Sequence, residues 1–301
     1  MEIVVEGLSV SYQRGTSMER DALSDLFLTI PAGAFAGVVG STGSGKSTLI
    51  RVLGGLLRPT RGRVRIGSVL ITPERQPPAT FAGQVGVVFQ FPEHQLFAET
   101  VAEDIAYGPR NLGLAKEEAA ARVRRAMEWV GLPPEVADRS PFRLSGGEMR
   151  RAAIAGVLAM EPRVLLLDEP TAGLDPAGRR ELMERIRFLH RERGMGVVLV
   201  SHDMDEVARH ADHLFVLSKG RCVFSGTPSQ LFAQGERLLQ WGLNLPETVR
   251  LIRRLNNRLD PPLSPDRYSV DALEEELIRR LRSAKPDRWS VPAVRDDGGA
   301  V

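Results

Sequence analysis

One short glycine-rich segment constrains the fold of this chain more than any other feature. Residues 40–48 read Gly-Ser-Thr-Gly-Ser-Gly-Lys-Ser-Thr and match the pattern G-x-x-x-x-G-K-[ST] at every fixed position. Glycine lets the backbone curl tightly, so that several N–H groups can converge on phosphate oxygens. A helix that begins near Lys46 would add the positive end of its dipole. This phosphate loop, preceded by a buried strand at 34–39, therefore predicts binding of a nucleoside triphosphate.

The residues of the phosphate loop have separate expected roles. Lys46 can reach the terminal phosphates, and the Ser47 hydroxyl can ligate Mg²⁺. The other residues of the loop would surround the phosphates, and they are Gly40, Ser41, Thr42, Gly43, Ser44, Gly45 and Thr48.

Length, charge and hydropathy limit the class of protein. A chain of 301 residues that is 43% hydrophobic can bury one large core or two modest ones. Its formal net charge of +2, with both signs spread along the chain, argues against a dedicated nucleic-acid surface. No secretory signal is evident, and the longest apolar stretches reach about half of the ~20 residues that span a bilayer. We therefore expect a soluble, cytoplasmic chain that reaches a membrane only through a partner.

The hydrophobic pattern predicts an α/β core that is interrupted by a helical block. Segments 2–12, 24–30 and 63–71 favour an antiparallel sheet beside the nucleotide site. Helical spacing dominates from about 99 to 160. Afterwards strands and helices alternate, which predicts a parallel sheet covered by helices. The predicted core strands are 34–39, 85–89, 164–167, 196–200 and 214–217, with helices at 176–193 and 204–211.

The composition changes after residue 226. Two helical patterns, 246–259 and 269–282, flank a proline-rich segment, and the final stretch is polar and is expected to be disordered. The predicted parts are a main domain at 1–235 with its helical subdomain at about 91–160, a C-terminal helical extension at 236–283, and a tail at 284–301.

Polar residues follow three of the predicted core strands. In an open parallel sheet the carboxyl ends of the strands line the ligand crevice. Asp168 would lie near Mg²⁺, directly or through water, and Glu169 would face the γ-phosphate and polarise an attacking water. Gln90 can ligate Mg²⁺ or hold water without a charge of its own. His202 can contact the γ-phosphate, although a histidine taken alone is more often structural.

A second anion site is predicted far along the chain from the phosphate loop. Ser145, Gly146, Gly147 and Glu148 open a helix, whose N-terminus can bind an anion. One chain can scarcely bring both sites onto the same nucleotide, so we expect two subunits arranged head to tail, each giving its Ser-Gly-Gly to the other's ATP. Asp175 would make a contact across that interface. Taken alone, Ser-Gly-Gly is also a common helix N-cap.

The order of these motifs resembles that of the ATP-binding-cassette (ABC) ATPases over about residues 1–235. The resemblance implies an α/β P-loop NTPase fold of the ABC type, with a RecA-like parallel-sheet core, an antiparallel β subdomain, an inserted helical subdomain and a C-terminal helical extension. It implies ATP and Mg²⁺ as cofactors and puts Tyr12 where the family stacks an aromatic ring on adenine. Glu148 departs from the family, which usually has glutamine there, and adds a negative charge near the partner's phosphates.

Within that family, four segments resemble the ATPase subunits of energy-coupling factor (ECF) importers, and more narrowly the second of their two paralogous ATPases. This implies ATP hydrolysis that powers uptake of a vitamin or a transition-metal ion. The implied partners are a second ATPase, either a paralogue or a second copy, a transmembrane coupling subunit and a separate substrate-binding membrane subunit. The implied location is peripheral, at the cytoplasmic face of the cell membrane. The four segments are residues 89–97, 105–109, 154–162 and 169–176.

Two questions stay open at this point. The alternative function is a soluble ABC ATPase that acts on nucleic acid or ribosomes, but the chain has one cassette, no sustained heptads and no basic stripe. The second question concerns Leu96 and Phe97. These apolar residues either pack under the next helix or line a groove that receives a short helix of the membrane subunit.

Overall fold

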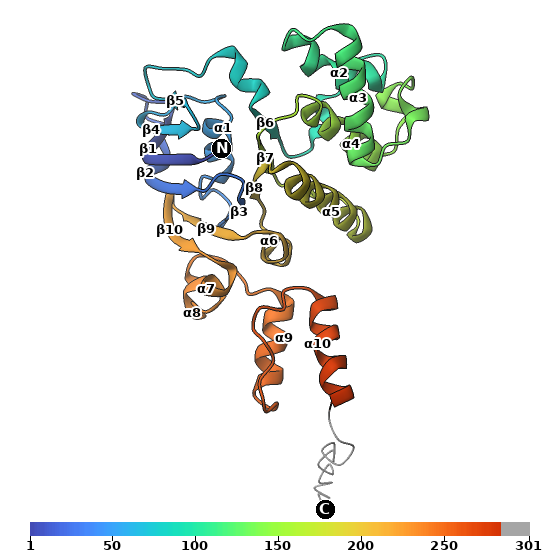
Figure 1. The fold of residues 1–301 in the computed structure, drawn as a ribbon. Coiled ribbons are helices and arrows are strands. Elements are labelled where there is room, and N and C mark those ends of the chain that lie inside the picture. Colours follow the sequence, from blue (N-terminus) through green and yellow to red (C-terminus); the bar gives the residue numbers. More distant parts are fainter. Residues whose placement is uncertain (284–301) are drawn as a thin grey trace, which may run out of the picture. The chain divides into compact units, whose positions relative to one another are not determined.

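A computed structural model describes residues 1–283, apart from the side chains of Glu236 and Ser283. The tail predicted at 284–301 lies outside the described residues. Contacts divide the chain into one unit at 1–245 and a second unit that begins at Pro246. The sequence pattern placed this division after residue 235. The first unit contains α7 (Pro228–Phe232), as that boundary implies, and also α8 (Glu236–Gln240), which lies beyond it; Figure 1 labels both helices.

The first unit contains a four-stranded antiparallel sheet. Its order is β2-β1-β4-β5, with strands β1 (Ile3–Tyr12), β2 (Arg20–Ile30), β4 (Arg61–Ile66) and β5 (Val69–Ile71). One face of β1 is buried, through Ile3, Val5, Leu8 and Val10. That alternation is what a half-buried strand requires, and the predicted antiparallel sheet is confirmed.

The second sheet of this unit is the core that the strand and helix alternation predicts. Its order is β10-β9-β3-β8-β7-β6, and every neighbouring pair is parallel except β9 with β10. Strands β3, β7 and β8 are buried along their whole length, as a sheet covered on both faces requires. The bounds are β3 (Phe35–Val39), β6 (Val85–Val88), β7 (Val164–Asp168), β8 (Gly196–Val200), β9 (His213–Ser218) and β10 (Arg221–Gly226).

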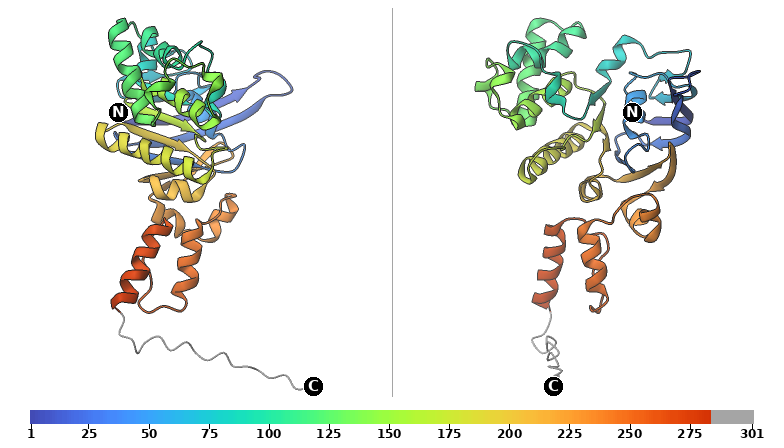
Figure 2. Two further views of the ribbon diagram at one scale, coloured as in Figure 1. Left: turned by 90° about the vertical axis from the view of Figure 1, so that its right-hand side faces the viewer. Right: turned by 180° about the vertical axis from the view of Figure 1, so that it is seen from behind.

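Helices cover both faces of the parallel sheet. Helix α1 (Lys46–Leu53) contacts β7 on one side and β2 on the other. Its apolar residues join both sheets in one core cluster. Helices α5 (Pro176–Arg193) and α6 (Met204–His210) lie on the opposite face (Figures 1 and 2). The carboxyl ends of β3, β6, β7 and β8 therefore meet at one edge of a rigid layer, where a ligand site is expected.

The helical block forms a compact subdomain of the first unit. Helices α2 (Val101–Asn111), α3 (Lys116–Val130) and α4 (Gly146–Leu158) pack against one another, as Figure 2 shows from two sides. The short 3₁₀ helix η2 (Pro92–Gln95) packs on α4. The Thr100 side chain caps α2 and Gly131 ends α3 with φ 70°, which are the local signals that start and stop helices.

The second unit contains helices α9 (Glu247–Asn256) and α10 (Val270–Ser283). A small apolar core is formed by Ile252, Leu263 and Leu273. The buried Glu276 carboxylate accepts hydrogen bonds from Arg267 and Arg280 at 2.8 Å each. The hydrogen bond from Arg267 makes the largest contribution to lowering the pKa of Glu276 to about 2. Across the residues that the structure describes, no helix combines the length and apolar character that crossing a bilayer needs.

Candidate functional site

The phosphate loop joins the buried strand β3 to helix α1, which is the context that the motif requires. Gly45 has φ 107°, and a Cβ atom there would lie 2.6 Å from the carbonyl oxygen of Ala22. At Gly40 a Cβ atom would lie 2.2 Å from the carbonyl oxygen of Leu217. The fold itself therefore requires glycine at both positions, because any side chain would collide with the backbone of a neighbouring strand.

Lys46 points back into the phosphate loop. Its Nζ donates hydrogen bonds to the carbonyl oxygens of Gly40, at 2.7 Å, and Ser41, at 3.1 Å. Burial lowers the pKa of Lys46, while the charges of Glu169 and Asp168 act in the opposite direction. The ammonium is thus held beside two carboxylates at the place where phosphates are expected.

A pocket of about 600 Å³ lies at the phosphate loop, and the predicted hydrolysis residues form part of its lining. Gln90, Glu169 and His202 line this pocket together with the loop. Arg20 and Ala22 of β2 line it as well. Sequence reasoning missed these two residues because no motif marks them. The pocket lining is Tyr12, Arg20, Ala22, Thr42, Gly43, Gly45, Lys46, Ser47, Thr48, Gln90, Glu169 and His202.

Glu169 lies between the other two predicted hydrolysis residues. The Gln90 Nε2 atom donates to Glu169 Oε2 at 3.4 Å, and His202 Nδ1 lies 3.1 Å from Glu169 Oε1. Glu169 has φ 50°, a left-handed conformation that is uncommon outside glycine and clusters at functional sites. Its N–H donates to the Val200 carbonyl at 2.9 Å, which ties the turn to β8. The carboxylate is thereby aimed from the end of β7 into the pocket.

The residues predicted to hold Mg²⁺ form an oxygen-rich set. The Ser47 hydroxyl hydrogen-bonds to Asp168, and Gln90 is on the same pocket wall. Burial raises the pKa of Asp168, and the hydrogen bond from Ser47 opposes that shift. Among residues 1–283 no group of three His, Cys, Asp or Glu side chains could hold a metal alone. The donor set therefore fits a hard cation that takes its remaining ligands from phosphates and water.

Tyr12 forms part of the pocket wall at the end of β1. Its hydroxyl lies 3.3 Å from the Thr48 hydroxyl, which fixes the ring beside the start of α1. Stacking of this ring on adenine stays a prediction.

The residues predicted to form a second anion site lie at the start of α4, and their binding of an anion stays a prediction. The Ser145 side chain caps α4, and the Glu148 carboxylate accepts hydrogen bonds from the Ser145 N–H at 2.9 Å and hydroxyl at 2.7 Å. The Ser145 hydroxyl bond makes the largest contribution to lowering the pKa of Glu148. The Asp175 side chain caps α5 by accepting from the Gly178 N–H at 2.7 Å. Glu148 therefore engages the same donors that a phosphate would need.

Ser145, Gly147 and Asp175 line a second pocket of about 490 Å³. None of the residues that line it also lines the pocket above the phosphate loop. Within one chain, the described structure keeps the two predicted anion sites in separate pockets.

Leu96 and Phe97 have different environments. Leu96 is 8% exposed, whereas Phe97 is 61% exposed and makes an edge-to-face contact with Tyr107 of α2 at 5.0 Å between ring centroids. Leu96 is therefore buried, and of these two residues only Phe97 is exposed enough to meet a partner. The sequence could not separate these two residues because both are apolar and adjacent.

Comparisons with known proteins agree with this geometry. The family model described as ABC transporter matches residues 23–172. An energy-coupling factor transporter ATP-binding protein EcfA2 of Symbiobacterium thermophilum is 53% identical over 95% of this chain and 100% of its own length. The protein of the same name from Caldanaerobacter subterraneus is 47% identical over 95% of this chain and 99% of its own length.

Solved structures support the same assignment. CbiO1 of Clostridium perfringens, part of the ABC transporter complex cbiONQ, has a TM-score of 0.70 and 36% identity over 86% of this chain and 95% of its own. A dimeric ATP-binding cassette in a post-hydrolysis state with ADP and Pi has a TM-score of 0.67 and 27% identity over 75% of this chain and 98% of its own. The chain therefore belongs to the ABC transporter family, in the group of energy-coupling factor transporter ATP-binding proteins.

Proposed function

We propose that this chain binds and hydrolyses ATP at a site completed by a second ATPase subunit, and thereby powers an ECF importer. The phosphate loop and Lys46 hold the β- and γ-phosphates. Ser47, Gln90 and Asp168 would hold Mg²⁺, which would neutralise charge on the phosphates. Glu169 polarises the attacking water, and His202 contacts the γ-phosphate beside it. Gln90 and His202 flank the Glu169 carboxylate at 3.4 and 3.1 Å, which supports orientation of the carboxylate toward that water.

One observation carries the need for a second subunit. A Cβ atom built on Gly146 or Gly147 would meet no heavy atom within 4 Å beyond its own helix backbone and chain neighbours, and neither residue has the left-handed φ that favours glycine. Nothing in residues 1–283 therefore requires glycine at the start of α4, in contrast to Gly45. Close approach of an external group does explain it, because a bare backbone lets N–H groups reach an anion. We infer that this group is the γ-phosphate of ATP held by the partner's phosphate loop.

Mixing two inactive variants tests this arrangement. In a dimer of this chain, a Lys46→Ala subunit and a Gly146→Asp subunit place both lesions at one composite site and leave the other site intact. We therefore expect each variant alone to lack ATPase activity and an equimolar mixture to regain activity from its mixed dimers. The measurement is phosphate release, with dimer mass recorded in ATP.

Two outcomes bear on the proposal. Mixed dimers that form and stay inactive would contradict the head-to-tail arrangement. If the wild-type chain alone forms no dimer in ATP, the same variants are tested in complex with a paralogous ATPase. The Lys46→Ala and Gly146→Asp variants of this chain should then impair different sites.

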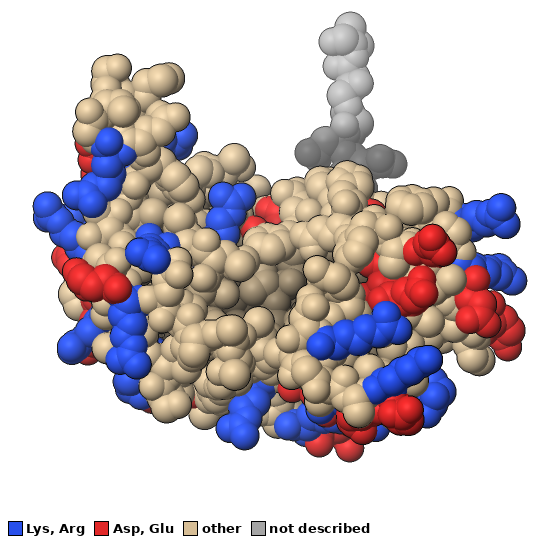
Figure 3. All heavy atoms as spheres, turned by 90° about the horizontal axis from the view of Figure 1, so that it is seen from above, with Lys and Arg blue, Asp and Glu red and all other residues tan. Residues whose placement is uncertain are grey.

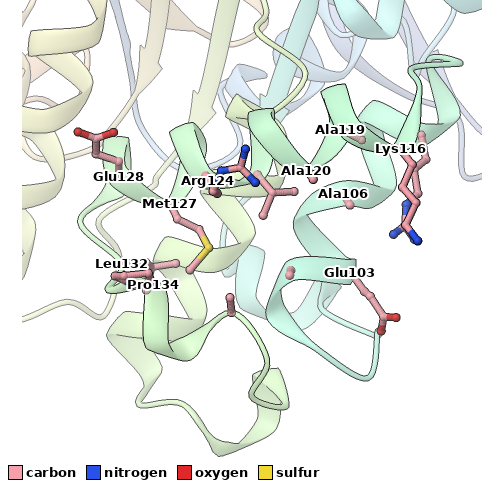
Figure 4. A pocket seen from close by; sticks show the side chains of 14 residues that line it. Glu103, Ala106, Lys116, Ala119, Ala120, Arg124, Met127, Glu128, Leu132 and Pro134 are labelled. Carbon is pink, nitrogen blue, oxygen red and sulfur yellow. The ribbon is translucent and has the colours of Figure 1, made fainter.

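We infer that the transmembrane coupling subunit docks on the helical subdomain. A groove of about 610 Å³ runs between α2 and α3. Figure 4 shows Ala106, Ala119 and Met127 along it, with charged side chains such as Glu103 and Glu128 toward its ends. An apolar floor with charges of both signs at the rim fits a short amphipathic helix of the partner. The exposed Phe97 precedes α2 and contacts Tyr107 of that helix, which forms one wall of the groove.

Replacement of Phe97 tests this docking surface. Because Phe97 is 61% exposed, Phe97→Asp should leave folding and ATP binding unchanged. Burial of such a ring is worth roughly 1.5–3 kcal/mol, so binding of the membrane subunit should weaken about tenfold to 100-fold. The measurement is binding of the detergent-solubilised coupling subunit. Phe188→Asp is the matched control, since Phe188 on α5 is equally exposed; equal loss in both variants would contradict the assignment.

The transported cargo and the location follow as further parts of this proposal. We infer a peripheral place at the cytoplasmic face of the cell membrane and a vitamin or transition-metal ion as cargo, selected by a separate membrane subunit.

The alternative, an ATPase that acts on nucleic acid or ribosomes, is not supported, because relatives matching nearly the whole chain are transporter subunits. On the face shown in Figure 3, charged side chains are spread around the rim and the middle is uncharged.

A further inference from the structure

Arg150 is a buried cation that links α4 to two other parts of the site, the segment after Gln90 and the loop after Glu169. It lies on α4, one turn after Ser145, and is 3% exposed. Its guanidinium forms a two-pronged ion pair with Glu93 of η2, through Nε to Oε2 at 3.0 Å and through an NH2 group to Oε1 at 2.7 Å. It also lies 5.8 Å from the centroid of the Phe91 ring. These contacts join α4 to the segment that directly follows Gln90.

The remaining nitrogen of Arg150 reaches the loop after Glu169. Its NH1 group donates to the Pro170 carbonyl at 3.3 Å and also to the Ala172 carbonyl. One side chain from α4 therefore contacts both loops whose residues Gln90 and Glu169 meet at 3.4 Å in the pocket. Only a planar fork with several N–H donors can make a carboxylate pair and two carbonyl contacts together.

Both loops hold backbone conformations that need external support. Phe91 and Glu169 have φ 55° and 50°, in a region that costs free energy for residues other than glycine. Burial acts to raise the pKa of Glu93, but the hydrogen bonds and charge of Arg150, helped by the backbone and His94, hold it below its ordinary value. The Glu93 carboxylate therefore stays charged and paired with Arg150 over the neutral pH range.

We propose that Arg150 is a positioning residue for ATP hydrolysis, which fixes the Gln90 and Glu169 loops relative to the start of α4. The inference rests on the proposed function, because α4 begins at the site assigned to the partner's nucleotide. A phosphate docked at Ser145 would press on the same helix that holds both loops. Through these contacts Arg150 holds the loops that bring Gln90 and Glu169 to their spacing of 3.4 Å.

The test compares turnover with nucleotide binding in the full-length protein. Arg150→Gln, Glu93→Gln and the double variant should each lower kcat about tenfold to 100-fold, since a misplacement of about 1 Å can cost roughly 10²-fold in rate. The Kd for ATP should stay within about twofold of wild type, because no phosphate ligand is removed. The double variant should lose no more than either single variant, because both changes break one unit. Arg150→Lys should fail as Arg150→Gln does, since a lysine can keep the ion pair but lacks the fork.

Arg122→Gln is the matched control. Arg122 of α3 also pairs with a carboxylate, Glu118 at 3.1 Å, and donates to a backbone carbonyl, that of Met160 at 3.3 Å, but it contacts neither loop. Losses of kcat equal to those of this control, additive losses in the double variant, or full activity in Arg150→Lys would overturn the proposal. A loss of ATP affinity as large as the loss of kcat would also overturn it, and so would unfolding of all the Arg150 and Glu93 variants. Either result would make Arg150 a structural residue. Wild-type turnover and ATP binding in the same assay test the proposed function separately.

Discussion

Glu169→Gln is expected to bind ATP as the wild type does and to lose nearly all turnover. The amide keeps the size of the side chain and can still hydrogen-bond to Gln90 and His202, which flank Glu169 at 3.4 and 3.1 Å. It lacks the negative charge that polarises the attacking water, and general-base roles of this kind are worth roughly 10²–10⁴ in rate. The measurement is kcat for phosphate release beside the Kd for ATP.

A second readout follows from the head-to-tail arrangement. If ATP joins two subunits and hydrolysis parts them, Glu169→Gln should accumulate as an ATP-bound dimer, visible by mass in solution. Glu118→Gln serves as the control, because Glu118 is an exposed glutamate of α3 outside the nucleotide pocket. Normal turnover of Glu169→Gln would remove this residue from the catalytic role.

Lys46→Ala is expected to weaken nucleotide binding itself. The variant deletes a charge that lies inside the phosphate loop, 2.7 Å from the Gly40 carbonyl and beside Asp168 and Glu169. A hydrogen bond to a charged group is worth about 1.5–3 kcal/mol, which corresponds to a Kd for ATP raised about tenfold to 100-fold. Calorimetric titration with ATP measures the change directly.

The control for this variant is Lys219→Ala. Lys219 is exposed and lies outside the lining of the nucleotide pocket, so its removal should leave the Kd unchanged. An unaltered Kd in Lys46→Ala would contradict the assignment of residues 40–48 as the phosphate loop. The two variants of the pocket are distinguishable, since loss of Lys46 acts on binding and loss of Glu169 acts on turnover.

The Glu148 carboxylate and the partner's ATP would compete for the same hydrogen-bond donors of Ser145. It occupies the Ser145 N–H and hydroxyl through the capping box, although the proposed function assigns these donors to the partner's ATP. Under the proposed function, docking of that nucleotide would require the Glu148 carboxylate to release these donors. Its negative charge would then oppose closure of the composite site.

Local patterns in the sequence were enough to predict the ligand loop and most of the strands, although β10 was not among the predicted core strands. The glycines of the phosphate loop are dictated by neighbouring backbone, as the clash of a Gly45 side chain with the Ala22 carbonyl shows. Alternating strands and helices predicted a parallel sheet. The carboxyl ends of such strands share one edge, so Gln90, Glu169 and His202 could be placed together before their distances were known.

Packing between distant segments decided the rest. Arg20 and Ala22 reach the pocket because β2 passes beside the phosphate loop, and Arg150 pairs with Glu93 because η2 packs on α4. Neither contact leaves a motif in the chain. Leu96 and Phe97 are both apolar and adjacent in the sequence, yet Leu96 is 8% exposed and Phe97 is 61% exposed. Hydrophobic periodicity determines which face of an element avoids water, but which atoms cover that face depends on how the elements pack in three dimensions.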